Sequence, residues 1–398
     1  AVGAIMTQSR ILPGWAPDRT IACIAAAALA LLQPGIDPVF LTLLTAATGL
    51  DPSDHGWIVG ATQGGMAIGA ILVWRGGAHL PAGAPAFAAL IALAASLITP
   101  ALDELATLIV ARGLFGVGMG VAYTHAMSAA ASQRPTGAYA AVFLVQLLLS
   151  TLVALALPAI GDSAGPAAAL RLLALAPIGV LLLSLLMPAA DPAQTPTSDA
   201  DERAPTPPRA WALAVALFCF IAATMMIWSF SGALALAAGI DDSVIGEAVA
   251  IGSVIGALTA IALMREQSIV PLPLTGLLCA FCLLAPLALT RHGAPTLFIL
   301  AIGLLNIGST ATIIRFSGLA TAAGGGSPLF RRFVACVHSL GMIAGPVAGS
   351  LLSDALGQQG LVDGALVALT GGCFALLVAA TPDRLRLPRI EGVHEIIA

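Results

Sequence analysis

The sequence contains no lysine, and all 16 of its basic residues are arginines. Acidic residues are nearly as scarce, so that charged side chains make up only 9% of the 398 residues and the formal net charge is −4. A soluble domain carries roughly a quarter charged residues. The shortage excludes an ordinary soluble protein, and the small, scattered net charge gives no basic surface for binding nucleic acid.

What the chain has instead is apolar length, because 59% of its residues are hydrophobic and its mean hydropathy is +1.00. A helix needs about 20 apolar residues to cross a hydrocarbon core of ~30 Å. The sequence therefore predicts an all-α membrane protein with twelve spans. They cover residues 20–47, 56–74, 83–100, 105–131, 138–159, 166–188, 210–237, 244–264, 270–290, 295–317, 330–355 and 361–381.

One long polar segment, 189–209, separates spans six and seven. It holds five prolines and a cluster of acidic residues, a composition typical of a linker. The predicted organisation is a six-helix bundle over 1–188, the linker 189–209, a second six-helix bundle over 210–382 and a tail over 383–398. The first apolar run is too long for a secretory signal and is interpreted as a retained span.

All six cysteines lie in apolar stretches, where cysteine behaves as a small hydrophobic residue. Cys279 and Cys282 form a CxxC pair, but it falls inside a predicted span and has no second pair to complete a metal site. We therefore expect no disulfide, no metal centre and no cofactor.

Arginine placement predicts the orientation of the spans. With both termini in the cytoplasm, only Arg171 and Arg291 lie outside, and acidic residues such as Asp51 and Asp103 face the outer side. The remaining arginines lie on the inner side or within spans, as the positive-inside rule requires. The sequence thus predicts a multi-pass protein of the cell inner (plasma) membrane.

The two predicted halves are related in sequence. Aligned without a gap at an offset of 190, residues 49–75 and 239–265 are identical at nine of 27 positions. The matches include the turn that begins at Gly49 and Gly239 and the closing arginines Arg75 and Arg265. A parallel repeat of six spans predicts a binding site between the halves, near the middle of the membrane.

Two glycine-rich spans carry a family resemblance. Span four reads Arg112-Gly113-Leu114-Phe115-Gly116-Val117-Gly118-Met119-Gly120, and span eleven combines Gly341, Gly345-Pro346 and Gly349-Ser350. With twelve spans and a central linker, the whole chain resembles the major facilitator superfamily, closest in pattern to proton-coupled members that move drugs or organic solutes. The resemblance implies alternating access between two bundles and a proton-coupled secondary transporter.

Two motifs depart from the pattern of that family. The antiporter signature normally lies in span five, whereas here its counterpart is in span eleven. The loop after span two normally reads Gly-x-x-x-Asp-Arg-x-Gly-Arg, but this chain reads Gly69-Ala-Ile-Leu-Val-Trp-Arg-Gly-Gly. The charged latch that the acid would form is therefore not expected here.

Asp37 and Arg112 are the main candidates for proton coupling, because ionisable residues inside spans are rare and usually functional. Asp37 follows Pro34-Gly35 and precedes Pro38, a setting that predicts a broken or kinked helix. Arg112 lies ~12 Å and Asp37 ~16–20 Å from the outer ends of their helices, which places them at similar depth. The alternatives are a solvated Asp37 near the interface and a purely structural Arg112.

Neutral polar residues and His338 at mid-span predict the walls of a substrate cavity. The candidates are Gln33, Gln63, Tyr123, Gln146, Thr224, Trp228, Ser231, Asn306, Thr310 and His338. Each of them would equally serve a contact between helices. His338 and Met342, with Met225, Met226 and Met127, would suit copper if they converged.

These features predict a secondary active transporter that moves a small, largely lipophilic organic solute, leaning to efflux by exchange with protons. A proton-driven importer of an organic anion held by Arg112 is the nearest alternative, followed by a copper transporter and a sensor without transport. An enzyme is not expected, because the spans contain no H-E-x-x-H or comparable cluster. The expected partners are the solute, protons and the bilayer, and we expect a monomer.

Overall fold

The computed structural model describes residues 17–50, 54–77, 79–187, 206–264 and 270–381. Twelve helical segments within them are long and apolar enough to cross a membrane, which confirms the twelve predicted spans. The first half comprises α1 (Pro17–Ala30), α2 (Leu32–Thr48), α3 (His55–Gly76), α4 (Ala84–Ile98), α5 (Leu105–Ala130), α6 (Pro135–Ala164), α7 (Pro166–Leu172) and α8 (Leu175–Ser184). The second half comprises α10 (Pro208–Ala237), α11 (Asp242–Leu263), α12 (Leu272–Leu289), α13 (Pro295–Ala323), α14 (Pro328–Leu356) and α15 (Gln358–Ala380).

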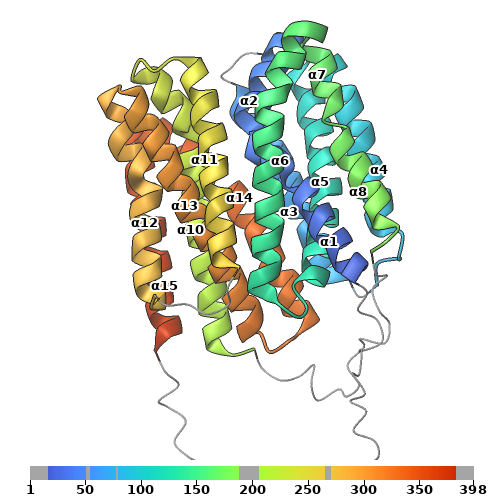
Figure 1. The fold of residues 1–398 in the computed structure, drawn as a ribbon, viewed down its shortest axis with the longest axis vertical. Helices are drawn as coiled ribbons and strands as arrows, with labels where there is room; N and C mark the ends of the chain where they lie inside the picture. The colour runs from blue at the N-terminus through green and yellow to red at the C-terminus, as the bar shows by residue number, and fades with distance from the viewer. Residues whose placement is uncertain (1–16, 51–53, 78, 188–205, 265–269, 382–398) are drawn as a thin grey trace, which may run out of the picture.

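The halves stand side by side as two bundles, the first blue to green and the second yellow to red in Figure 1. The predicted linker falls largely outside the described residues, and the predicted tail falls wholly outside them. The six cysteines are free thiols.

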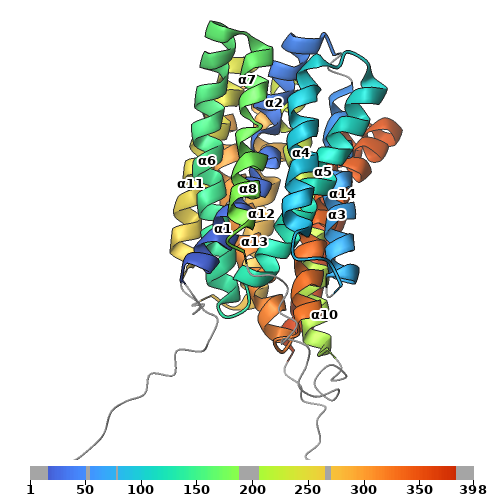
Figure 2. The ribbon, with the colours of Figure 1, turned by 90° about the vertical axis from the view of Figure 1, so that its right-hand side faces the viewer.

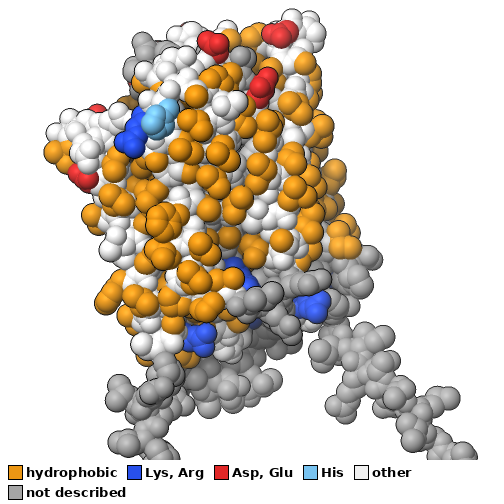
Figure 3. All heavy atoms as spheres, turned by 60° about the vertical axis from the view of Figure 1, so that its left-hand side comes forward, with side chains coloured by type: hydrophobic (Ala, Val, Ile, Leu, Met, Phe, Trp, Pro, Cys, Tyr) orange, Lys and Arg blue, Asp and Glu red, His pale blue; other side chains and the backbone are white. Residues whose placement is uncertain are grey.

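Charged side chains gather at the two ends of the bundle, and Figure 3 shows a broad belt of apolar side chains between them. We call one end the arginine end, after Arg19, Arg75, Arg134, Arg209, Arg331 and Arg332. The other is the carboxylate end, after Asp54, Asp103, Glu104, Asp162, Asp241, Asp354 and Asp363, and it also holds Arg171 and Arg291. Exposed apolar side chains in the belt, such as Phe281 and Phe374, are suited to contact with lipid.

The sequence repeat has a structural counterpart at its glycine turn. Gly49 ends α2 with φ of +72°, and Gly239 follows α10 with φ of +78°. Side chains with a Cβ are strained in this left-handed region, so the turn requires glycine in both halves.

Glycine also lets α3 and α5 pack backbone to backbone. A Cβ at Gly65 would fall on the carbonyl of Gly113, and one at Gly116 would fall on the carbonyl of Thr62. The glycine-rich motif of span four is therefore an interface between helices, as small residues commonly are in membranes.

The first span is broken at Leu31, between α1 and α2, which confirms the predicted break. A proline ring clashes with the carbonyl four residues earlier and supplies no N–H to it. For Pro34 that carbonyl belongs to Ala30, the last residue of α1. The chain thus breaks one turn before the proline that causes the break.

The halves meet through α6, which packs on α11 and α13, and through α3, which packs on α14. At the arginine end four aromatic rings join α3, α10 and α14. We call Trp74, Trp211, Phe330 and Phe333 the ring cluster, in which neighbouring ring centroids lie 5.0–5.6 Å apart. Thr136 of α6 also lies against Gly318 of α13. The arginine end is therefore closed between the halves.

The contact between α3 and α14 does not continue to the carboxylate end. A Cβ at Gly64 would lie 2.9 Å from the Cδ1 atom of Ile343, whereas one at Gly60 or Gly56 would find nothing within 4 Å. Val347 and Leu351, one and two turns beyond Ile343, are 46% and 66% exposed. The two helices therefore separate toward the carboxylate end.

Candidate transport site

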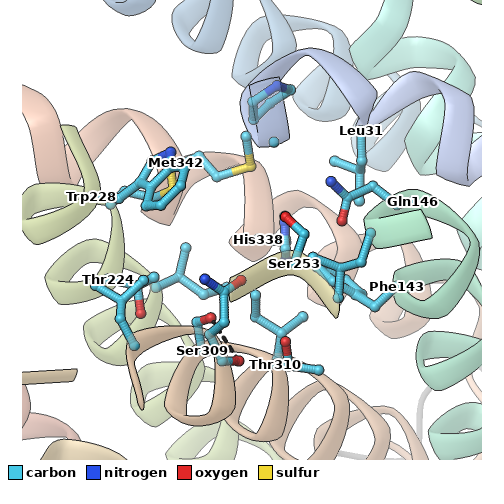
Figure 4. Close-up of a pocket in the computed structure, with 18 residues that line it drawn as sticks. Leu31, Phe143, Gln146, Thr224, Trp228, Ser253, Ser309, Thr310, His338 and Met342 are labelled. Atoms are coloured by element: carbon cyan, nitrogen blue, oxygen red, sulfur yellow. Dashed lines mark hydrogen bonds between the residues drawn. The ribbon is translucent and has the colours of Figure 1, made fainter. Parts of the chain in front are cut away.

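A cavity of about 100 Å³ lies between the two halves. The first half contributes Leu31 and the start of α2 together with α6, and the second contributes α10, α11, α13 and α14 (Figure 4). None of its 18 described lining residues is Asp, Glu, Lys or Arg. The position is the one expected for a substrate site in a protein with two repeated halves.

Six of the ten predicted substrate residues line this cavity. They are Gln146, Thr224, Trp228, Asn306, Thr310 and His338, and Figure 4 labels all but Asn306 around the same space. Ser253 and Ser309 also line it and were not predicted. Ser309 lies one turn from Asn306 in α13. It could therefore have been predicted from the polar face that Asn306 and Thr310 share. No comparable pattern marks Ser253.

Several polar side chains in the wall use their donor groups on their own helices. Thr224 donates to the Phe220 carbonyl at 2.8 Å, and Asn306 donates to the Ile302 carbonyl at 3.0 Å. Ser309 donates to the Asn306 carbonyl at 3.3 Å, and the Gln146 amide donates to Ser150 at 2.9 Å. Their oxygen atoms keep lone pairs for further hydrogen bonds. The cavity therefore offers acceptors together with donors, the donors being the Trp228 indole N–H and the second N–H of the Gln146 and Asn306 amides.

Asp37 lies in α2 outside the cavity lining and is 7% exposed, which rules out a solvated carboxylate. Gln33 donates to its Oδ1 atom at 3.2 Å, and Gln63 of α3 donates to its Oδ2 atom at 3.5 Å. These two amides, predicted as substrate contacts, do not line the cavity and instead hold the carboxyl group of Asp37.

Arg112 of α5 is 2% exposed and also lies outside the cavity lining. Its Nε atom donates to the Thr62 hydroxyl at 3.2 Å, and its guanidinium stacks on the rings of Phe40 and Phe115 at 4.6 and 4.2 Å. Its Nη2 atom is buried without a hydrogen-bond partner. Asp37 and Arg112 act on each other electrostatically without a direct ion pair.

The two charges are joined through α3. Thr62 and Gln63 are consecutive residues of this helix, and the first binds Arg112 while the second binds Asp37. We call Gln33, Asp37, Thr62, Gln63 and Arg112 the charge cluster. It lies wholly within the first half, and the cavity lining at Pro34 and Gly35 is on the same short helix, α2, as Asp37.

Tyr123 and Ser231, the other two predicted contacts, support lining residues from behind. The Tyr123 ring lies 5.5 Å from the ring of His338, which also contacts Phe143 at 5.7 Å. These contacts join α5 and α6 of the first half to α14 of the second. Ser231 donates to the Trp228 carbonyl at 2.8 Å.

The predicted copper ligands converge only in part. His338, Met342 and Met225 line the cavity. Met226 instead packs where Gly345 and Gly349 meet α10, and Met127 is buried in the core outside the lining. Within the described residues, no group of three or more His, Cys, Asp or Glu side chains is placed to hold a metal ion.

The fold is similar to that of the human organic anion transporter MFSD10 (TETRAN), with a TM-score of 0.69 and 16% sequence identity over 91% of this chain and 100% of that chain. No family model matches the sequence, and no curated protein matches it either. The likeness shows the fold, which is that of the major facilitator superfamily. The chain is thus a multi-pass α-helical membrane protein.

Proposed function

We propose that this chain, which has the major facilitator fold, is a proton-coupled secondary transporter of a small, largely lipophilic organic solute. The observation that carries the proposal is a cavity between the halves next to a buried carboxyl group on a broken helix. By the positive-inside rule the arginine end faces the cytoplasm of an inner (plasma) membrane. The closed arginine end then corresponds to an outward-facing state, which importers and exporters both pass through. We propose efflux in exchange for protons as the direction of transport.

The chemistry of the wall favours an uncharged or cationic solute over an anion. The lining is free of acidic and basic residues apart from His338, so no arginine or lysine among its described residues could pair with an anion, whereas its oxygen acceptors and the Trp228 ring can face a cation. An anion buried without a paired cation carries a large desolvation cost. Arg112, the cation that would hold an anion, faces Thr62 and two aromatic rings instead.

Proton coupling is assigned to Asp37. As a carboxylate it accepts hydrogen bonds from the Gln33 and Gln63 amides. When protonated it becomes a donor, and the Oε1 atom of Gln63, buried without a partner, is an acceptor on the same side chain. A change of charge at Asp37 alters its attraction to Arg112, and α2 carries that change to Pro34 and Gly35 in the cavity wall.

Proteoliposomes with an imposed pH gradient test the proposal. Three probes differ in charge: ethidium is a cation, chloramphenicol is neutral and p-aminohippurate is an anion. We expect a pH gradient to drive uptake of the cation or the neutral solute by the natural chain. Asp37→Asn should lose the response to the gradient but keep exchange of solute across the membrane. Asp103→Asn, an exposed acid at the carboxylate end, is the matched control and should behave as the natural chain.

The proposal fails if no probe moves with or without a gradient, the result expected of a sensor without transport. It also fails in its proton step if Asp37→Asn remains coupled. Inward movement of p-aminohippurate with protons would favour the organic anion importer. That alternative is suggested by MFSD10, which is described as an organic anion transporter. Saturable uptake of Cu(I) that is lost in His338→Ala and Met342→Leu would favour the copper transporter.

A further inference from the structure

A second cavity lies on the outer surface of the first half, between α3, α4 and α5 near the arginine end. Its volume is about 770 Å³, and none of its lining residues belongs to the cavity between the halves. Figure 2 shows α3 and α4 on either side of α5 on this face of the bundle. The second cavity is therefore separate from the proposed transport path.

The walls of this cavity are apolar. Leu72 of α3 and Phe87 of α4 are 50% and 66% exposed, and α5 contributes Val117 and Val121. Gly118 brings α5 against α4, because a Cβ there would fall on the carbonyl of Ala88. Exposed apolar walls in the belt of the bundle match hydrocarbon chains and not a water-soluble ligand.

Arg75 is the single charged side chain among the 14 described lining residues. It is exposed at the end of α3, and its guanidinium lies 4.6 Å above the Trp74 ring. No carboxylate among the described residues pairs with it. The positive charge therefore lies at the arginine end of an apolar groove. From there the groove extends along α4 from Ala84 to Ile91, a rise of ~10 Å.

We propose that this groove binds one anionic phospholipid of the leaflet at the arginine end. The phosphate of the headgroup contacts Arg75, and one acyl chain lies between Phe87, Ile91 and Val117. The charge of Arg75 complements an anionic headgroup at the height where headgroups lie, and the apolar walls continue toward the interior of the bilayer. The first turn of α4 opens at the same mouth, and its dipole also favours an anion.

The bound lipid would also brace the closed arginine end. Trp74, on which Arg75 stacks, belongs to the ring cluster that joins the halves. Holding Arg75 at the membrane surface restricts the end of α3 and favours the contact of Trp74 with Phe333. The proposal rests on this groove and not on transport, so it stands or falls independently of the proposed function.

Native mass spectrometry of the full chain tests this proposal. The protein is released from nanodiscs made of phosphatidylcholine or of an equimolar mixture with phosphatidylglycerol. We expect the natural chain to retain one phosphatidylglycerol in preference to phosphatidylcholine. Arg75→Gln should lower that retention about fivefold, the effect of one arginine at a membrane surface. Arg209→Gln removes an exposed arginine from the same end of the bundle and should change nothing.

A second variant tests the apolar part of the groove. Ala84→Trp fills the groove without changing its charge and should lower retention of either lipid, and Phe87→Ala provides the same test if the tryptophan prevents folding. Equal retention of both lipids by the natural chain overturns the anionic preference. Loss of retention in Arg75→Gln alone, with both groove variants unaffected, shows adsorption at the surface and overturns the groove site. Displacement of the lipid by ethidium or chloramphenicol would make the groove an entrance for solute instead.

Discussion

In the first half the opening span breaks at Leu31 and carries Asp37, whereas its counterpart α10 runs unbroken from Pro208 to Ala237. At the offset of 190, Asp37 corresponds to Ile227 and Arg112 to Ile302, and both isoleucines are 1% exposed. The second half thus buries hydrocarbon at the two positions where the first half buries charge. The second half forms the same arrangement of helices without these charges, so the fold does not require them. This supports a functional role for Asp37 and Arg112.

The cavity wall shows what the halves still share. Leu31, Pro34 and Gly35 line it from the first half, and the residues 190 positions later, Ile221, Thr224 and Met225, line it from the second. The halves differ at the next level, because α13 contributes five lining residues and its counterpart α5 contributes none. The glycines of α5 instead draw it onto α3, which places Arg112 within hydrogen-bonding distance of Thr62.

The comparison is tested most severely by removing the buried charge. Arg112→Met should lower the free energy of unfolding by about 3 kcal/mol, because it leaves the buried Asp37 without a compensating cation. Ile302→Met, the same product at the counterpart position, should cost less than about 1.5 kcal/mol. Denaturation in mixed detergent micelles measures both. Adding Asp37→Asn to Arg112→Met should recover part of the loss, and equal effects at residues 112 and 302 would remove the distinction between the halves.

Glycine-to-alanine substitutions should distinguish the backbone contact between α3 and α5 in the first half from the side-chain contacts around Gly256 of α11. In Gly116→Ala the new Cβ meets the backbone of Thr62 and Met66, which cannot move aside, so we expect a loss of about 1–3 kcal/mol. In Gly256→Ala the nearest atoms are the ends of the Leu147 and Thr310 side chains, at 3.0 and 3.1 Å, and a loss of about 0.5 kcal/mol is expected. The same denaturation experiment checks this order, and a reversed order would contradict it.

Trp74→Ala should loosen the closed arginine end without unfolding the protein. The contact between Trp74 and Phe333 contributes about 1 kcal/mol beyond the area it buries. We expect a cysteine placed at Ser317, which is buried, to react about fivefold faster with a maleimide added from that side, in a background without the native cysteines. Trp57→Ala, at an exposed tryptophan near the carboxylate end, is the control and should leave the rate unchanged.

Effects of similar size are expected in the cavity wall of the second half. Thr224→Ala and Asn306→Ala each remove one acceptor and should weaken binding of whichever probe is transported by about fivefold, the equivalent of ~1 kcal/mol. Ser231→Ala removes a hydroxyl that bonds to the Trp228 carbonyl outside the lining and should leave affinity unchanged. Solute counterflow measures the affinity of all three variants. A loss in Ser231→Ala equal to the others would show that the residues lining the cavity are assigned incorrectly.

The sequence was a good guide wherever one helix alone decides the outcome. Apolar length predicted the twelve spans, and Pro34 predicted the break, although the clash four residues back places it at Leu31. Depth along each helix put Asp37 and Arg112 at one level. It did not reveal that Thr62 and Gln63 stand between them, because the rotation of α3 depends on its glycine contacts with α5.

The candidate site was predicted less completely, for the same reason. Gln33 and Gln63 have the polarity of cavity residues, but their helices turn them toward Asp37. Whether a polar side chain faces solute, a neighbouring helix or a buried charge depends on how the two halves pack. The ring cluster was hidden for another reason, because Trp74 and Phe333 lie more than 250 residues apart in the chain.

The sequence lacks the acid of the charged latch after span two, and in the structure the ring cluster joins the halves at that place. The contact at the closed end therefore depends on different solution conditions than an ion pair would. Ion pairs at a surface weaken as salt screens them. Contacts between apolar rings are not weakened by electrostatic screening, but their strength comes from releasing water and falls on cooling. The contact that holds the arginine end of this molecule together is therefore sensitive to temperature. Cooling, and not a rise in ionic strength, is the change that loosens it.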